Sequence, residues 1–294
     1  MKKIIVILGP TGSGKTKISI DLAKKFNGEI VSADSRQVYR FLDIGTDKIA
    51  KEKMDGIVHH LLDVASPKRI FSVVQYQKKA LNAIKNIHKR DKIPFIVGGS
   101  GFYIQSIVDN IAYPKTKRDN KLRKKLAKKG VKELFSILEK LDPVRAKNID
   151  KKNPVRLIRA IEIAKQLEKV SPITKKTSPY QFLIIGLKIN ENKIDDICKK
   201  RFNKWIKRGL IKEIKNLQEI GLSWEKIESF GLYYFILAQY IQGKISRKEA
   251  FEKSIISLRQ YIKKQITWFK KEKRIVWVDN KKEALDKIQG FLKN

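Results

Sequence analysis

A stretch of eight residues near the start of the chain constrains the fold more than any other feature. Residues 9–16 read Gly-Pro-Thr-Gly-Ser-Gly-Lys-Thr and match the phosphate-loop pattern G-x-x-x-x-G-K-S/T at every position. The apolar run at 4–8 is typical of a buried parallel strand, and the apolar spacing at 18–26 predicts a helix. A strand, a glycine-rich loop and a helix in this order form a phosphate cradle. We therefore predict that the chain binds a phosphorylated ligand.

Two side chains of this loop have predicted roles of their own. Lys15 is expected to reach across the phosphates, and the Thr16 hydroxyl is expected to hold Mg²⁺. The residues predicted to bind a diphosphate or nucleotide are Gly9, Pro10, Thr11, Gly12, Ser13, Gly14, Lys15 and Thr16.

The charge of the chain points to a polyanionic partner. Its 294 residues contain 66 Lys and Arg against 30 Asp and Glu, a formal net charge of +36. Such an excess is typical of a nucleic-acid-binding protein, although a lysine-rich proteome would account for part of it. No apolar run approaches the length of a membrane span, and the single Cys198 excludes an internal disulfide and a cysteine-based zinc site. We therefore expect a cytoplasmic monomer without a membrane partner.

The apolar runs predict an α/β fold, a P-loop NTPase-like parallel sheet flanked by helices. Buried strands are indicated at 4–8, 29–34, 94–101 (which ends in a glycine turn), 182–189 and 274–278. Helices are indicated at 72–90, 102–108, 193–208, 210–220, 232–241, 247–271 and 281–292. Ser72 is the expected N-cap of the first of these.

The character of the sequence changes after Tyr113-Pro114. Up to residue 177 it shows no strand pattern, only charged helical patterns at 117–129, 131–141 and 154–168. We therefore predict an all-helical insertion domain at 115–177, and a core domain formed by 1–114 and 178–294. Arg156 and Arg159 stand three residues apart and are expected to share one helix face.

Asp34 and Ser35 stand at the end of the second predicted strand. In open α/β sheets, ligand-facing groups lie at the carboxyl ends of strands, so both residues should lie near the phosphate loop. The glycine turn at 98–101 should form a second wall of the same pocket, because glycines allow a ligand to approach closely. The adjacent His59 and His60 point to different sides of a strand or helix, so we expect a structural role rather than a metal pair.

Six further blocks occur in an order that a phosphate loop alone does not explain. They are Ser-Ala-Asp-Ser-Arg-Gln-Val-Tyr-Arg at 32–40, Leu-Asp-Ile-Gly-Thr at 42–46, His-His-Leu-Leu-Asp at 59–63, Pro-Phe-Ile-Val-Gly-Gly at 94–99, Arg-Leu-Ile-Arg-Ala-Ile-Glu at 156–162 and Lys-Lys-Gln-Ile-Thr-Trp-Phe at 263–269. With the phosphate loop, these blocks resemble the bacterial tRNA dimethylallyltransferases, or tRNA isopentenyltransferases. The family usually has threonine at the position of Ser100. It often has Gly-Tyr-Lys or Gly-Tyr-Arg in place of Gly231-Leu232-Tyr233.

The resemblance implies transfer of a dimethylallyl group from dimethylallyl diphosphate to the exocyclic N6 amine of the adenosine 3′-adjacent to the anticodon in tRNA. It implies Mg²⁺ as the cofactor and the anticodon stem-loop of tRNA as the partner. The reaction needs a base for the amine proton, stabilisation of the leaving diphosphate and exclusion of water. The expected base is Asp34. Ser100 is expected to position the amine or the leaving group, and Arg201 is expected to contact the diphosphate.

The target adenosine lies stacked in the anticodon loop, so it has to be extruded and its neighbours need compensating contacts. On the resemblance, the residues expected to bind tRNA are Asp34, Ser35, Arg36, Gln37, Arg156, Arg159, Lys263, Lys264, Gln265 and Trp268. For Trp268 and Phe269, packing in the core is an open alternative.

Two other functions use the same loop. A nucleotide or small-molecule kinase would place ATP there, but it leaves the positive charge, the paired arginines and the Asp34-Ser35 pair unexplained. A P-loop ATPase acting as a nucleic-acid-binding switch would require an apolar strand that ends in an acidic residue for the metal, and residues 31–34 are a weak version of that pattern.

Overall fold

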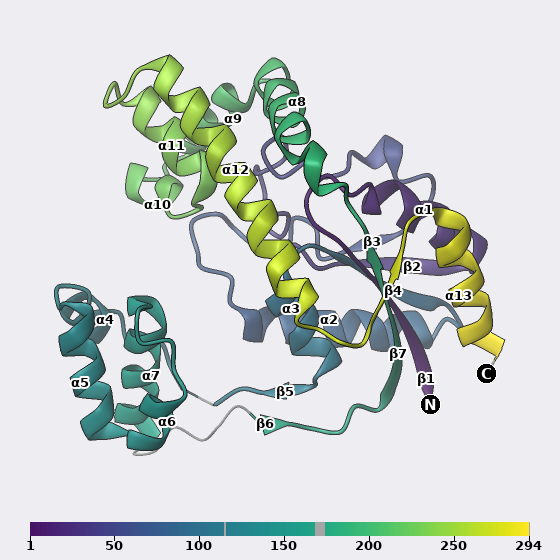
Figure 1. Ribbon diagram of the computed structural model, residues 1–294, viewed down its shortest axis with the longest axis horizontal. Helices are drawn as coiled ribbons and strands as arrows, with labels where there is room; N and C mark the ends of the chain where they lie inside the picture. The colour runs from purple at the N-terminus through teal and green to yellow at the C-terminus, as the bar shows by residue number, and fades with distance from the viewer. Residues whose placement is uncertain (115, 168–173, 294) are drawn as a thin grey trace. The chain divides into compact units, whose positions relative to one another are not determined.

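The computed structural model describes residues 1–114, 116–167 and 174–293 (Figure 1). The chain divides into two compact units, Met1–Val108 with Ser178–Asn294, and Asp109–Thr177. Within the described ranges, no helix combines the length and the apolar character that a membrane span requires.

The first unit is built on a six-stranded sheet in which all neighbouring strands run parallel, in the order β3-β2-β4-β1-β7-β8. The strands are β1 (Lys2–Leu8), β2 (Gly28–Ser32), β3 (His59–His60), β4 (Ile93–Gly98), β7 (Tyr180–Leu187) and β8 (Ile275–Val278). Residues 4–8 of β1 are at most 1% exposed, as expected for a central strand covered on both faces. The predicted parallel sheet flanked by helices is confirmed.

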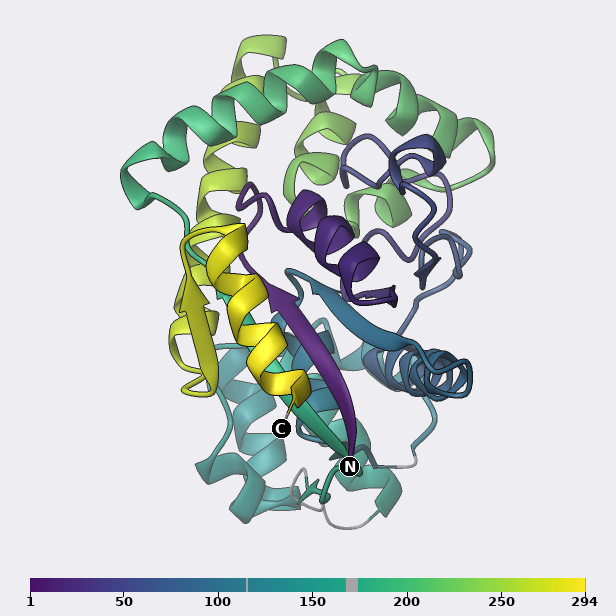
Figure 2. The ribbon, with the colours of Figure 1, turned by 90° about the vertical axis from the view of Figure 1, so that its right-hand side faces the viewer.

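Alternate residues of β1 point into two helical layers. Ile5 and Ile7 pack with α1 (Lys15–Lys25) and α13 (Lys281–Lys293), on the face seen in Figure 2. Ile4, Val6 and Leu8 belong to a larger cluster with the helices of the other face. These helices are α2 (Val73–His88), α3 (Gly101–Val108), α8 (Ile194–Lys207), α9 (Leu210–Glu219), α10 (Trp224–Glu228), α11 (Leu232–Ile241) and α12 (Arg247–Lys270). Figure 1 shows α12 running from the group of α8, α9 and α11 back toward α3.

Local sequence sets where several helices begin. Ser72 and Gln75 form a capping box at the start of α2, which confirms the predicted N-cap. The apolar pattern does not predict α10, because its five residues are too few to show a period. The signal that marks it is Ser223, whose hydroxyl accepts a hydrogen bond from the Lys226 N–H.

The second unit contains four helices among its described residues and one short sheet. The helices are α4 (Asn120–Leu126), α5 (Val131–Leu141), α6 (Pro143–Lys147) and α7 (Pro154–Leu167). Leu134, Leu138, Leu157 and Ile161 form their common core. Residues 115 and 168, at the predicted edges of the insertion and of its last helix, lie outside the described residues.

The short sheet corrects the prediction that the insertion has no strand. β5 (Ile111–Ala112) pairs antiparallel with β6 (Thr174–Lys175). Strands of two residues show no alternation that a sequence pattern could detect. The pairing joins the segment that leads into the unit to the one that leads out of it. Both strands lie within the compact unit Asp109–Thr177.

Candidate active site

A pocket of about 760 Å³ lies where the loops after β1 and β2 meet α8, α11 and α12. We call it the phosphate-loop pocket. Its lining includes Thr11, Gly12, Lys15, Thr16, Asp34, Arg36, Gln37, Asp47, Arg201, Trp205, Arg208, Leu232, Tyr233, Leu258 and Tyr261. Phosphate-loop residues and the segment after β2 therefore share one pocket, as the sequence predicts for the carboxyl ends of parallel strands.

The backbone of the phosphate loop is shaped for an anion. Gly12 and Gly14 have φ angles of 89° and 80°, in the left-handed region that glycine adopts without strain. Helix α1 begins at Lys15 and has no acidic side chain in its first turn. Its unpaired N–H groups and its dipole therefore favour a negatively charged ligand at this end.

Lys15 lies among charged groups of both signs. Its Nζ donates a hydrogen bond to the Pro10 carbonyl at 3.2 Å. Burial, and then repulsion from Arg201, lower the pKa of Lys15 to about 8, while Asp34 and Asp47 act in the opposite direction. An anion bound between the two cations would relieve this repulsion and favour the charged form of Lys15.

Asp34 is anchored in the turn that follows β2. Its Oδ1 accepts hydrogen bonds from the N–H groups of Arg36 at 2.8 Å and Gln37 at 3.2 Å. Among the described residues, no hydrogen bond engages Oδ2. Gln37 is itself held, because its Nε2 donates to the Thr46 carbonyl at 3.0 Å. A fixed carboxylate with one uncommitted oxygen in a ligand pocket can accept a proton.

Ser100 supports this turn from the end of β4. Its Oγ accepts a hydrogen bond from the Ser35 N–H at 2.9 Å, and its own N–H donates to the Ala33 carbonyl at 3.1 Å. Gly98 makes this approach possible, since a Cβ there would lie 2.1 Å from the Ala33 oxygen. Ser100 is not among the described residues that line the phosphate-loop pocket. The geometry gives it a contact with the backbone beside Asp34, and its predicted role in positioning the amine or the leaving group stays a prediction.

Arg201 projects from α8 into the same pocket. Its Nη2 lies 2.6 Å from Asp47 Oδ2, and its guanidinium lies 5.0 Å from the ring centroid of Trp205. Arg208 Nη1 lies 3.1 Å from the other oxygen of Asp47. Sequence reasoning missed Asp47 and Arg208. The available signals were the position of Asp47 directly after the block at 42–46, and the spacing of Arg208 two helical turns after Arg201.

Apolar side chains form another part of the lining, and sequence reasoning missed these as well. They include Trp205, Leu232, Tyr233, Leu258 and Tyr261. The Tyr233 hydroxyl donates to the Gly45 carbonyl, and burial raises the pKa of Tyr233 and of Tyr261, so both hydroxyls stay neutral. The pocket thus combines cationic and phosphate-binding groups with an apolar wall. This combination suits a ligand that has an anionic group and a hydrocarbon part.

Helix α12 holds its predicted tRNA-binding residues in different environments. Lys263 and Lys264 are exposed. Gln265 is only 6% exposed, its Oε1 accepts from the Thr11 N–H at 2.9 Å, and its Nε2 donates to the Gly99 carbonyl at 2.9 Å. Both ends of the Gln265 amide are thus used inside the protein, which does not favour the predicted contact with tRNA.

Trp268 and Phe269 differ in how far they are packed in the core. Phe269 is fully buried in the main hydrophobic cluster. Trp268 is half-buried and meets the Phe269 ring edge-on at 5.5 Å. It also lies against Gly101, where a Cβ would be 2.4 Å from the indole. Trp268 is thus partly committed to the contact between α12 and α3.

The two arginines of α7 also differ from each other. Arg156 is exposed, and its Nη1 lies 3.9 Å from Asp150 Oδ2. Arg159 bonds to Glu162, a carboxylate with no exposed side-chain surface, which also accepts two hydrogen bonds from Arg123 at 2.8 and 2.6 Å. These bonds outweigh the cost of burial and hold the pKa of Glu162 at about 2. Arg159 therefore neutralises a charge inside the second unit, and its predicted contact with tRNA stays a prediction.

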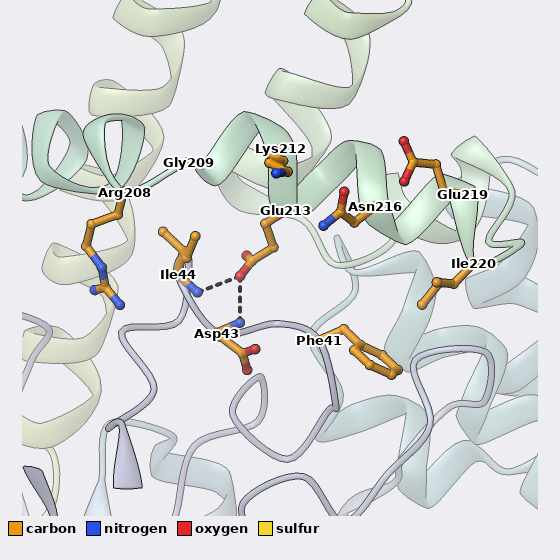
Figure 3. Close-up of a pocket in the computed structure, with 10 residues that line it drawn as sticks. All are labelled: Phe41, Asp43, Ile44, Arg208, Gly209, Lys212, Glu213, Asn216, Glu219 and Ile220. Atoms are coloured by element: carbon orange, nitrogen blue, oxygen red, sulfur yellow. Dashed lines mark hydrogen bonds between the residues drawn. The ribbon is translucent and has the colours of Figure 1, made fainter. Parts of the chain in front are cut away.

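A second cavity, of about 530 Å³, lies between α9 and the loop at 41–44 (Figure 3). Its main feature is Glu213, whose carboxylate accepts hydrogen bonds from the N–H groups of Asp43 at 2.8 Å, Ile44 at 2.5 Å and Gly45 at 3.2 Å. The Tyr234 hydroxyl donates to the same carboxylate at 2.7 Å. Glu213 therefore fixes the loop that leads directly to Asp47 in the phosphate-loop pocket.

His60 contacts a buried carboxylate. His60 Nε2 lies 2.7 Å from the buried Glu29, which also bonds to Arg90 and Lys92. Among the described residues, no group of three His, Cys, Asp or Glu side chains could hold a metal ion.

The fold and the pocket define an α/β protein with a phosphate loop, in whose pocket cationic side chains and an apolar wall lie together. The chain belongs to the IPP transferase family, whose model matches residues 37–272. This membership confirms the resemblance drawn from the sequence blocks and does not support the kinase alternative.

The names of relatives and of solved structures that are similar to this chain are consistent with this family. A tRNA dimethylallyltransferase of Carboxydothermus hydrogenoformans is 40% identical, over 98% of this chain and 95% of the relative. One of Acetivibrio thermocellus is 38% identical, over 100% and 96%. The full-length tRNA isopentenylpyrophosphate transferase of Bacillus halodurans superimposes with a TM-score of 0.74 at 35% identity, covering 100% of this chain and 96% of that one. A eukaryotic dimethylallyltransferase acting on tRNA gives a TM-score of 0.77 at 27% identity, covering 95% and 74%.

Proposed function

We propose that this chain transfers a dimethylallyl group from dimethylallyl diphosphate to the exocyclic N6 amine of the adenosine 3′-adjacent to the anticodon in tRNA, and releases diphosphate. The observation that carries the proposal is one pocket that combines the phosphate loop, an anchored carboxylate at Asp34 and an apolar wall. The relatives named above, which cover nearly the whole chain, support the same reaction. We further propose that the enzyme works as a monomer in the cytoplasm.

The donor is proposed to bind with its diphosphate on the phosphate loop. Lys15 and Arg201 supply positive charge at the point where charge accumulates on the leaving group. Trp205, Tyr233 and Tyr261 would face the hydrocarbon part and keep water from the allylic carbon.

Mg²⁺ is proposed to bind at Thr16, which lines the pocket and is the residue whose hydroxyl holds the ion in this motif. Because no cluster of acidic and histidine ligands is found among the described residues, the diphosphate oxygens would have to provide part of its coordination. When bound, the ion would neutralise charge on the leaving diphosphate.

Asp34 is proposed to be the base. In the reaction, the bond from the adenosine N6 to the allylic carbon forms and the bond from that carbon to the diphosphate oxygen breaks. The amine proton then passes to the Asp34 carboxylate. Ser100 would act indirectly, by holding the turn that carries Asp34.

The anticodon stem-loop is proposed to bind through exposed cations. Arg36 lines the pocket, and Lys263 and Lys264 are exposed on α12. Arg156 is the exposed arginine of α7. Contacts of these side chains with phosphates would offset the cost of extruding the adenosine.

The test is incubation of the protein with an unmodified tRNA that has adenosine at this position, together with labelled dimethylallyl diphosphate or labelled ATP. We expect label in the tRNA only with the dimethylallyl donor. We expect none when the adenosine is replaced by guanosine, which lacks the N6 amine. Transfer of the ATP γ-phosphate to any acceptor, or no transfer from the dimethylallyl donor, would contradict the proposal.

A further inference from the structure

Gln265 joins two loops that are far apart in the sequence. Its side-chain oxygen accepts from the Thr11 N–H in the phosphate loop, and its side-chain nitrogen donates to the Gly99 carbonyl, both at 2.9 Å. The two loops follow β1 and β4, which are neighbours in the sheet. Gln265 is 6% exposed, so water cannot easily replace either bond.

Glycines allow α12 to approach these loops closely. A Cβ at Gly99 would lie 2.5 Å from Gln265 Nε2, and a Cβ at Gly101 would lie 2.4 Å from the ring of Trp268. Gln265 and Trp268 are three residues apart, so they occupy one face of α12. This face contacts the turn at 98–101 at two points, and the relative position of helix and turn is therefore fixed.

The turn at 98–101 also supports the segment that carries Asp34, the proposed base. Ser100 lies between Gly99 and Gly101, and its hydroxyl accepts from the Ser35 N–H, next to Asp34. Three hydrogen bonds and the covalent link between Gly99 and Ser100 thus connect Thr11 through Gln265 to Ser35. They connect the loop proposed to hold the diphosphate to the carboxylate proposed to take the proton.

We infer that Gln265 is a positioning residue that sets the phosphate loop in register with the turn carrying Asp34. The inference rests on the proposed function for its meaning in catalysis, but it makes a separate statement about diphosphate binding. Without the amide, the Thr11 N–H and the Gly99 carbonyl lose their partners and the phosphate loop is free to shift. Small misplacements of reacting groups lower the rate of transfer.

The experiment compares Gln265→Leu, which has a similar size but loses both bonds, with Gln265→Glu, which when ionised keeps an acceptor for the Thr11 N–H and has no donor for the Gly99 carbonyl. Inorganic diphosphate is titrated into each full-length variant by calorimetry, and kcat and KM for transfer are measured separately. We expect Gln265→Leu to bind diphosphate at least about tenfold more weakly, the effect of losing buried hydrogen bonds. Gln265→Glu should be no better, because its carboxylate faces a carbonyl and repels the anion. The tRNA dissociation constant of Gln265→Leu, measured without donor, should change less than about twofold, because the residue is buried.

Ile262→Ala is the matched control. Ile262 is fully buried on α12 about one turn before Gln265 and makes no polar contact with the loops. Its substitution should lower the thermal stability and leave the diphosphate affinity of the folded protein unchanged. Gln265→Leu with wild-type diphosphate affinity and wild-type kcat would overturn the inference, and so would a loss confined to tRNA binding. Failure of the wild-type protein to transfer the dimethylallyl group would instead overturn the proposed function, while the diphosphate titrations would still decide the role of Gln265.

Discussion

At the scale of single residues, ligand binding in the phosphate-loop pocket depends on how its charged side chains are paired. Lys15 and Arg201 repel each other, Asp47 lies between Arg201 and Arg208, and Asp34 is anchored through one oxygen. The cations thus have carboxylate partners within the pocket. A diphosphate would compete with Asp47 for Arg201 and would add the negative charge that Lys15 needs. The pH dependence of diphosphate binding and the effect of Asp34→Asn should both reflect these charges.

The first concerns the pH dependence of diphosphate binding. The pKa of Lys15 is lowered from 10.5 to about 8, so the side chain is charged below that pH and neutral above it. We expect the affinity for diphosphate to fall as the pH rises from about 7 to about 9, and we expect proton uptake on binding near pH 8. Calorimetry in two buffers of different ionisation enthalpy measures both quantities. The control is Lys15→Arg, which stays charged and should show a much flatter profile, and a flat wild-type profile would contradict the assignment.

The second concerns Asp34→Asn. Asparagine retains an oxygen that can accept from the N–H groups of Arg36 and Gln37, so the turn should persist while the base is lost. We expect kcat to fall by about 10²–10⁴-fold, with little change in donor or tRNA affinity. The measurement is the single-turnover rate, titrated with Mg²⁺. Recovery of a near wild-type rate at high Mg²⁺ would instead show that Asp34 acts through the metal.

At the scale of elements, one helix carries two arginines with different tasks. On α7, Arg159 helps to neutralise the buried Glu162, whereas Arg156 remains exposed. The pKa of Glu162 lies near 2, below its value in an unfolded chain. Its contribution to stability is therefore present above about pH 4.5 and is lost as the pH falls toward 2.

We accordingly expect the two alanine variants of α7 to separate stability from tRNA binding. Arg159→Ala leaves Glu162 with Arg123 and the Asp119 N–H, and should cost about 1–3 kcal/mol of unfolding free energy. Arg156→Ala should leave stability unchanged and reduce the slope of log affinity for tRNA against log salt by about 1. Thermal unfolding and tRNA binding at several salt concentrations test both. An unaltered salt slope for Arg156→Ala would show that this arginine does not contact the tRNA backbone.

At the scale of the whole molecule, the net charge of +36 predicts tRNA binding that weakens steeply with salt. The positions of the cations affect this salt dependence as much as their number does, because only cations near the bound RNA release counterions. In the first unit, α12 and α13 pack on opposite faces of the sheet. This arrangement supplies a matched pair of double variants.

Lys263→Gln with Lys264→Gln on α12 should weaken tRNA binding and lower the salt slope by about 2, one for each lost phosphate contact. Saturating tRNA should restore most of kcat, because neither lysine lines the phosphate-loop pocket. The same charge change at the exposed Lys282 and Lys287 of α13 should leave the slope nearly unaltered. Equal changes of the salt slope from both pairs would mean that tRNA binding depends on the total charge of the protein rather than on the lysines of α12.

The sequence by itself determined the features that reside in contiguous residues. The phosphate loop, the parallel strands, most of the long helices and the cap at Ser72 were predictable, because apolar spacing and backbone preference depend on neighbours within a few positions. The blocks shared with the family allowed the activity to be predicted as well, and they put Asp34 and Arg201 in the candidate site. Both line the phosphate-loop pocket.

Only the tertiary structure decided which side chains meet across the chain. Gln265 and Thr11 are 254 positions apart, and Glu213 and Asp43 are 170 apart, so no local pattern signals either bond. The same holds for Arg159, whose pattern is that of a surface arginine until the burial of Glu162 is known. A side chain's role depends on the partners and the solvent around it. Those are fixed only when the helices pack on the sheet, or on one another in the second unit.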